Sequence, residues 1–206
     1  MMTPIQLTRR LAILGGAVAL GGCSAVSALN AAGTALDTYD LIPSSGGTTG
    51  RQTRRTLLVA LPDATAAIST DRILVRPDAA AITYLPDGRW TSELPRVVQS
   101  LLVRAISGTG RIGYVGPREG GPVPDSALLT RVDAFDVTIG ADRIPVAAID
   151  ITLTVLDDRD QRVIGARRFS QSVPVAGDSP AAIVAGFQAL VDALLPAMAD
   201  WVLDRA

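Results

Sequence analysis

The chain has 206 residues, of which 48% are hydrophobic and 19% are charged, and its formal net charge is −1. This length suggests one domain that can bury a core without disulfide bonds. The apolar content excludes disorder throughout the chain. Because no run of about 18 or more consecutive apolar residues occurs, a polytopic membrane protein is excluded as well.

Residue types that many active sites need are missing. The sequence has no histidine and no lysine, and Cys23 is its only cysteine. These absences exclude a Ser-His-Asp triad, a Cys-His pair, a zinc site with histidine or cysteine ligands, a Walker phosphate loop and a Schiff base. Asp157, Asp158 and Asp160 lack the spacing of an EF-hand and favour a turn. A carboxylate-based hydrolase is the remaining enzymatic alternative; we expect no enzyme, no metal and no cofactor.

Residues 1–22 are typical of an export signal. Arg9-Arg10 precedes the apolar segment Leu11–Leu20, which is too short to span a bilayer as a helix. Leu20-Gly21-Gly22-Cys23 then resembles the lipobox of bacterial lipoproteins. In those proteins cleavage makes the cysteine the new N-terminus, which carries diacylglycerol and a further acyl chain such as palmitate. A plain secretory signal with an incidental cysteine is the alternative, and the general and twin-arginine export routes both stay open.

The predicted anchor also indicates a location. Two or three acyl chains on Cys23 would hold the protein on a membrane almost irreversibly. Ser24, rather than an aspartate, follows the cysteine, and by resemblance to sorted lipoproteins this favours the periplasmic face of the outer membrane. Removal of residues 1–22 leaves 17 arginines against 20 acidic residues, a net charge of −3. This mild acidity argues against nucleic acid as a partner.

The rest of the chain divides into a short tether and one domain. Residues 23–38 comprise the lipidated cysteine and a tether of small residues, and residues 39–206 form a single domain. The expected strands are 39–42, 55–61, 72–76, 80–85, 112–115, 127–139, 146–156 and 163–173. Pro86-Asp87-Gly88 is expected to end the fourth strand, and the polar turn 157–161 is expected to join the last two in a hairpin.

Two segments have helical periodicity. In residues 94–106 the apolar positions follow the helical spacing, Thr91 or Ser92 can cap the start, and Gly108 can end the helix. The second helix starts at Pro180 after the cap Ser179, and Pro196 within it predicts a kink or a break. The sequence therefore predicts an α+β fold: a mainly antiparallel mixed sheet of about six to seven strands, with two amphipathic helices packed on one face.

Ordered motifs along the chain indicate a family. They are Tyr39-Asp40-Leu41, Leu57–Ala60, Asp71–Arg76, Tyr84, Arg89–Pro95, Arg131–Phe135, Ala166–Phe169 and Trp201. Over about Tyr39–Val202 this order resembles the ABC-type transport auxiliary lipoprotein family, the group that contains PqiC. The resemblance implies an inner-membrane ABC transporter and a periplasmic MCE-domain protein as partners, with the lipoprotein at the outer membrane. It provides no catalytic residues.

Four residues are candidate contacts to a partner or a lipid headgroup. Arg72 and Arg76 share one face of a strand, and Arg89 and Trp90 form the sharpest motif. The alternatives are that the arginines are solvated or bridged to aspartates, and that Trp90 packs against the start of the first helix.

Two further groups each have a functional and a structural interpretation. The basic cluster Arg51, Arg54 and Arg55 either touches anionic lipid or belongs to a solvated loop. Phe187, Met198 and Trp201 either line a lipid groove or belong to the core.

The predicted function is that of a non-enzymatic outer-membrane lipoprotein that docks on the MCE protein of a lipid transport system. The alternative is a structural envelope lipoprotein without a role in transport. A homo-oligomer is compatible with either hypothesis. Because the two helical stripes and the alternating strands hold about as much apolar surface as one core consumes, we expect no deep lipid cavity.

Overall fold

The computed structural model describes residues 36–140 and 142–206. The chain divides into two units, residues 1–35 and 36–206, and everything below concerns the second. The predicted signal, Cys23 and most of the predicted tether therefore lie outside the described residues.

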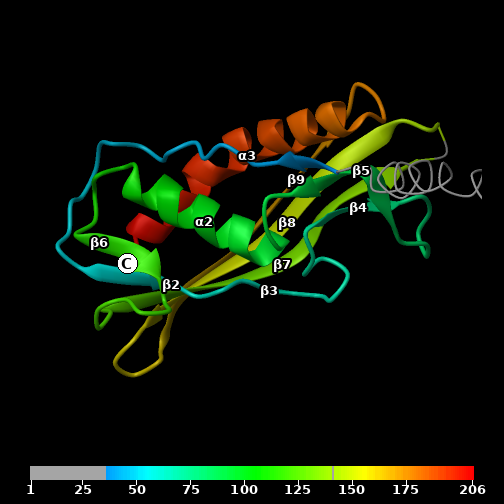
Figure 1. The fold of residues 1–206 in the computed structure, drawn as a ribbon. Coiled ribbons are helices and arrows are strands. Elements are labelled where there is room, and N and C mark those ends of the chain that lie inside the picture. The colour runs from blue at the N-terminus through cyan, green and yellow to red at the C-terminus, as the bar shows by residue number, and fades with distance from the viewer. Residues whose placement is uncertain (1–35, 141) are drawn as a thin grey trace, which may run out of the picture. The chain divides into compact units, whose positions relative to one another are not determined.

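Nine strands form one mixed sheet, and two helices accompany it (Figure 1). The strands are β1 (Asp37–Tyr39), β2 (Thr56–Val59), β3 (Asp63–Ala64), β4 (Arg72–Arg76), β5 (Thr83–Trp90), β6 (Tyr114–Pro117), β7 (Ser126–Ile139), β8 (Pro145–Asp157) and β9 (Val163–Pro174). The helices are α2 (Leu94–Ser107) and α3 (Pro180–Leu203). The α+β class predicted from the sequence is confirmed.

The long strand β7 organises the sheet. One of its edges pairs along its whole length with β8, which in turn pairs with β9; both pairings are antiparallel. The other edge pairs in succession with β2 near its start, β3 in its middle and β4 near its end, always in parallel. Strands β5 and β1 extend the sheet beyond β4, and β6 extends it beyond β2. Every strand is thus joined to β7 directly or through one or two neighbours.

Side-chain alternation explains why β7 and β8 are buried on one face. Ile149, Ile151 and Leu153 of β8 are two residues apart and all point into the core. In β7 the buried Val132 and Phe135 are three residues apart, because the pairing register with β8 shifts between Val132 and Ala134. This irregularity turns Phe135 back towards the core.

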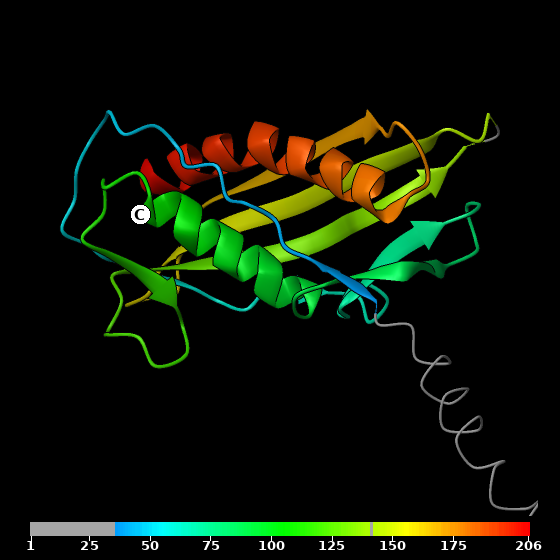
Figure 2. The same ribbon diagram turned by 45° about the horizontal axis from the view of Figure 1, so that its top comes forward.

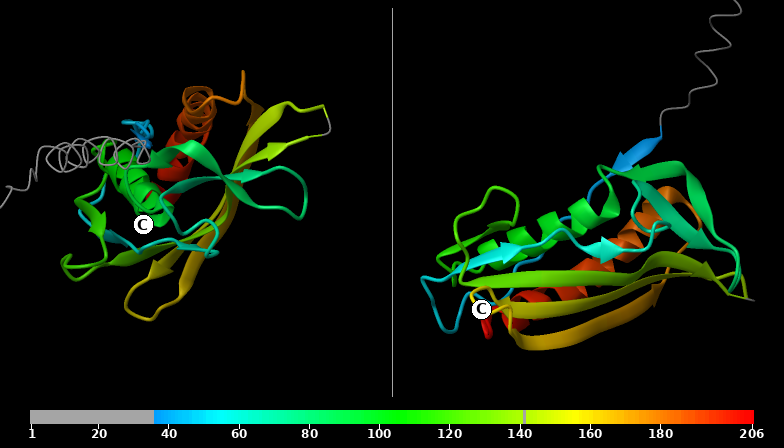
Figure 3. Two further views of the ribbon diagram at one scale, coloured as in Figure 1. Left: turned by 45° about the vertical axis from the view of Figure 1, so that its right-hand side comes forward. Right: turned by 90° about the horizontal axis from the view of Figure 1, so that it is seen from below.

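Both helices lie on the same face of the sheet, as predicted, and the opposite face of β7, β8 and β9 carries no helix (Figures 2 and 3). The apolar sides of α2 and α3 join the inward residues of the sheet in one hydrophobic core. Trp90, Phe135 and Phe187 meet at its centre, with ring centroids 4.8–5.8 Å apart.

Several expectations about the sheet were wrong. The sheet has nine strands instead of six to seven, because the short β1 and β3 pair with longer neighbours. Strand β5 continues through Pro86-Asp87-Gly88, because β1 pairs with Gly88–Trp90 and the missing proline N–H falls at an exposed position. The two longest ladders are antiparallel as predicted, but five of the eight strand pairings are parallel.

One expectation about α2, its N-terminal cap, is wrong, and another, its end at Gly108, is confirmed. Its N-cap is Glu93, without a side-chain cap, because the carbonyl of Thr70 accepts the N–H of Leu94 at 3.0 Å. Gly108 ends the helix with ordinary right-handed geometry. Glycine is needed there for space, since a Cβ would collide with the hydroxyl of Ser45.

The start of α3 agrees with the sequence, whereas its middle does not. The Ser179 hydroxyl accepts the N–H of Ala182 at 3.3 Å, which confirms the predicted cap. The helix then continues through Pro196, so the predicted break is wrong. An internal proline costs about 3 kcal/mol, and burial of Leu195 and Met198 on either side offsets that cost.

Candidate docking surfaces

The four candidate contact residues lie on the neighbouring strands β4 and β5, but they do not form one surface. Arg72 and Arg89 are directly opposite each other in the β4–β5 ladder. Nη2 of Arg72 donates to the carbonyl of Leu85 at 2.9 Å, which fixes its side chain against the sheet. Nε of Arg89 donates to Thr38 at 3.3 Å, and the guanidinium lies 3.7 Å from Asp71. Of this pair, Arg89 is the more available to a partner.

Arg76 is neutralised by a buried partner. Its Nε donates to Oδ2 of Asp136 at 2.7 Å, and the Asp136 side chain is only 5% exposed. Because a buried carboxylate needs its counter-charge, this arginine is committed to the fold.

Trp90 lies in the core, 1% exposed, against Phe135 and Phe187. Phe187, Met198 and Trp201 are buried as well. These contacts correspond to the packing interpretation of the aromatic residues, and they leave Trp90 unavailable at the surface of the described domain.

The face of the sheet without helices carries compensated charges. Arg131 of β7 makes a hydrogen-bonded ion pair with Asp133, and Arg168 of β9 makes one with Asp150 of β8. The hydrogen bond from Arg131 holds the pKa of Asp133 below its usual value, while partial burial opposes that effect. Together with the pair of Arg76 and Asp136, this gives three ion pairs in which an arginine is matched by an aspartate. A phosphate headgroup would have to displace an aspartate to reach any of these three arginines.

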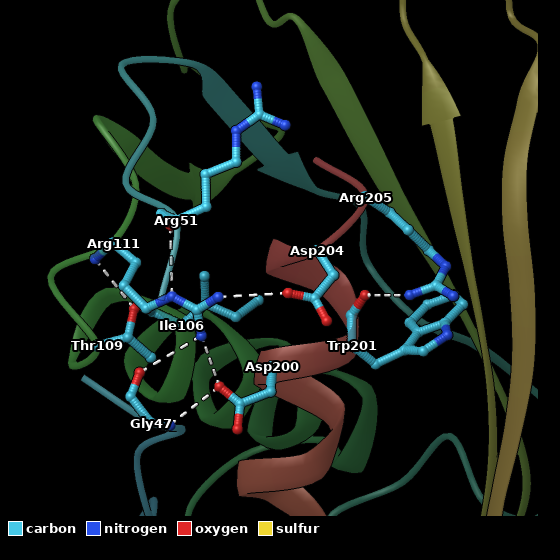
Figure 4. Close-up of polar contacts among 9 residues, drawn as sticks. All are labelled: Gly47, Arg51, Ile106, Thr109, Arg111, Asp200, Trp201, Asp204 and Arg205. Carbon is cyan, nitrogen blue, oxygen red and sulfur yellow. Dashed lines mark hydrogen bonds and ion pairs between the residues drawn. The ribbon is translucent and has the colours of Figure 1, made fainter. Parts of the chain in front are cut away.

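A buried arginine that the sequence analysis missed ties three segments together (Figure 4). The side chain of Arg111, which follows α2, is 5% exposed. Its Nη1 lies 2.8 Å from Oδ1 of Asp200, and its Nη2 lies 3.3 Å from Oδ1 of Asp204. It also donates to the carbonyls of Gly47 and Arg51, each at 3.5 Å. Arg111 therefore fixes the segment 47–51 against the last turns of α3.

The described core contains one small apolar cavity of about 20 Å³ between the helices and the sheet. Val98, Leu102, Phe135, Ile151, Leu194 and Met198 are among its walls. A cavity of that size holds about one water molecule, whereas ligand pockets measure about 300–1,000 Å³. It does not accommodate an acyl chain.

Comparison with known proteins identifies the family. The sequence model of the ABC-type transport auxiliary lipoprotein component matches residues 39–199, which is most of the chain. The chain belongs to this family. Membership associates the protein with an ABC-type transport system and with a lipoprotein location in the cell envelope. No curated protein matches the chain.

Solved structures share the fold. Protein XCC0632 from Xanthomonas campestris, assigned to family DUF330, is 25% identical, with a TM-score of 0.75 over 82% of this chain and 96% of that one. An uncharacterized protein is 15% identical, with a TM-score of 0.59 over 82% and 97% of the two chains. Hypothetical protein CT253 from Chlamydia trachomatis is 9% identical, with a TM-score of 0.51 over 74% and 98%. The last two support the fold alone.

Helix α3 of this auxiliary lipoprotein domain is long and strongly apolar. By length and composition, α3 could cross a bilayer. However, its residues Phe187, Leu190 and Val202 are buried in the core against the sheet and α2. Its apolar character is explained by that packing, so we assign α3 to the core of the domain.

Proposed function

We propose that this lipoprotein is the outer-membrane component of an MCE-type lipid transport system. Acyl chains on Cys23 hold it at the periplasmic face of the outer membrane, and the domain docks on the periplasmic MCE protein. The observation that carries the proposal is the family match over residues 39–199, following a lipobox-like Leu20-Gly21-Gly22-Cys23. The ABC transporter that energises the system then lies in the inner membrane.

The domain acts in this proposal as a docking protein, without catalysis and without carrying lipid itself. The cavity of about 20 Å³ supports this restriction, because a lipid carrier needs an enclosed apolar pocket of at least about 300 Å³. Native mass spectrometry of the protein tests this part. A phospholipid adduct at a one-to-one ratio would make the protein a carrier and would refute docking alone.

Co-purification tests the proposed partner. The full-length protein with an affinity tag after Ala206 is isolated from solubilised membranes of its native host. We expect an MCE-domain protein and an ABC ATPase in the eluate. Recovery of only cell-wall fragments or porins would instead support a structural envelope lipoprotein.

The Cys23→Ala variant tests the anchor. It is compared with wild type by metabolic labelling with an alkyne fatty acid and by membrane fractionation. We expect label and stable membrane association in wild type only, because Cys23 is the sole cysteine of the chain. Equal labelling of both proteins would contradict lipidation at this residue.

A further inference from the structure

The arginines of the described residues fall into two groups. Most form ion pairs, donate to carbonyls or stack on aromatic rings. Within residues 36–140 and 142–206, those whose side chains make no such contact are Arg51, Arg54, Arg55, Arg96, Arg104, Arg143 and Arg159. Arg143 and Arg159 lie in two separate turns, whereas the other five belong to α2 and to the segment just before β2. Unpaired charge is therefore concentrated in one region of the domain.

A groove of about 210 Å³ lies in that region, between α2 and β6. Its walls are Arg96, Gln99, Ser100, Val103, Arg104 and Pro117. The carboxylate nearest to these walls by their hydrogen bonds is that of Glu119, which accepts from Gln99 at 3.4 Å, so the two arginines of the wall remain without a counter-charge. The two arginines are eight residues apart on the helix, which places them about 12 Å from each other along its axis. Pro117 has no backbone N–H, so this wall of the groove offers one donor fewer to an anionic ligand. Most of the donors in the groove are therefore side chains of α2.

Residues 51–55 bring further positive charge to the C-terminal end of α2. The N–H of Thr53 donates to the carbonyl of Arg111 at 2.9 Å, and the N–H of Tyr114 donates to the carbonyl of Arg55 at 3.2 Å. These bonds hold the segment at the start of β6, which follows the end of α2 after a short connection. The side chain of Arg51 points away from the Arg111 network in Figure 4 and leaves its guanidinium free.

We propose that the basic groove, formed by Arg96 and Arg104 with Arg51, Arg54 and Arg55 at its end, binds an acidic, extended segment of a partner protein. The inference rests on the proposed docking function and assigns a surface to it. About four residues of extended chain span the 12 Å between the two helix arginines. Carboxylates on such a segment match the forked donors of guanidinium groups.

The groove runs from the Arg96 end, near β1, to the Arg104 end, farther from β1, and this direction favours a partner segment that extends away from the anchor over a flat membrane surface. An anchor at Cys23 reaches the described domain through β1, beside the exposed Asp37 and Asp40. From there the chain follows α3 from Gln188, which bonds Ile42, to Asp200, which bonds Gly47. Twelve helical residues cover about 18 Å, so Arg51 lies well away from the point where the anchor enters. The Arg96 end of the groove lies nearer to that point, because the N–H of Thr91, just before α2, donates to the carbonyl of Tyr39 in β1 at 2.9 Å.

Peptide binding tests the proposal. The full chain is purified in a non-ionic detergent, and fluorescence anisotropy measures its affinity for a labelled deca-glutamate peptide. The test variant is Arg96→Gln/Arg104→Gln. The matched control is Arg143→Gln/Arg159→Gln, which removes the same charge from two unpaired arginines elsewhere. We expect the Kd to rise about tenfold or more in the test variant and less than about twofold in the control.

Other outcomes would overturn the proposal. Equal weakening by both variants would mean that only net charge matters. Binding to phosphatidylglycerol vesicles that depends on Arg96 and Arg104, without binding of the peptide, would assign the groove to a membrane surface. Charge-dependent self-association in sedimentation velocity would assign it to a second copy of the chain. The peptide assay uses no MCE protein, so a negative result in it would not change the outcome of the co-purification test of the proposed function.

Discussion

Replacement of Arg111 by methionine separates the role of the buried guanidinium from that of its apolar stem. The variant keeps a side chain of similar length but removes the 2.8 Å contact to Asp200 and the 3.3 Å contact to Asp204. Breaking a fully buried ion pair costs about 3–5 kcal/mol, because a charge is left buried. Here the carboxylates left behind are 44% and 63% exposed and can be hydrated by water. We therefore expect a smaller loss, about 2 kcal/mol of unfolding free energy.

Two assays measure that loss. For a domain of this size about 1 kcal/mol shifts Tm by about 2–4 °C, so Tm should fall by about 4–8 °C. Trypsin reports the local effect, because Arg51 is a cleavage site in the segment 47–51 that Arg111 fixes, and Arg54 and Arg55 follow it closely. We expect cleavage there to accelerate about tenfold or more in Arg111→Met, as the local opening becomes easier.

The matched control is Arg118→Met, which breaks a 3.6 Å pair between Arg118 and Asp158 at the surface. An exposed pair contributes about 0–1 kcal/mol, so its Tm and its cleavage rate should stay close to wild type. If Arg111→Met behaves like this control, the network in Figure 4 does not hold the segment and the reasoning fails.

Three other outcomes follow from the core and the sheet. Arg76→Leu should lower the free energy of unfolding in urea melts by about 3–5 kcal/mol, because it leaves Asp136 buried without a counter-charge. Adding Asp136→Asn to the same chain should restore part of that free energy, and a double variant without any restoration would exclude a charge effect. Trp201→Ala should lower the free energy of unfolding by about 3 kcal/mol, because the Trp201 ring packs against Phe169 and under Arg205. Coincident denaturant melts of the variant and wild type would mean that this ring contributes no packing. The lowered pKa of Asp133 stabilises the fold above the unfolded value of about 3.9, and this contribution is lost as pH falls through the folded pKa. Below about pH 4 the stability of Asp133→Asn should therefore depend less steeply on pH than that of wild type, and parallel profiles would contradict the assignment.

Local sequence signals were sufficient for the long elements. Helices α2 and α3 and the strands β7, β8 and β9 have periodic apolar residues over many positions, and each was placed within a few residues. The hairpin between β8 and β9 follows from the polar turn that joins them. Short elements without such a period, β1 and β3, form because a partner strand supplies their hydrogen bonds.

The contacts that the sequence concealed are those between distant segments. Arg111 is 89 residues from Asp200 and 93 from Asp204, and nothing near it marks it as buried. One signal was available: Asp200 and Asp204 are four residues apart at the C-terminal end of α3, where two like charges repel each other unless a cation lies beside them. Such a pair favours a neighbouring cation, but it does not say which arginine provides it.

Compensation of charge restricts where on the described domain an anionic partner would gain binding free energy. The two helices cover one face of the sheet, and their inward side chains leave a cavity of only about 20 Å³. On the other face, each of Arg76, Arg131 and Arg168 has its own aspartate, so an incoming charged group would have to displace an existing ion pair. Such an exchange gives little net free energy. A partner gains more from cations that lack a counter-charge, because no pair has to be broken first. Within the described residues, those cations concentrate around the groove between α2 and β6, and it is there that a charged partner would bind most tightly.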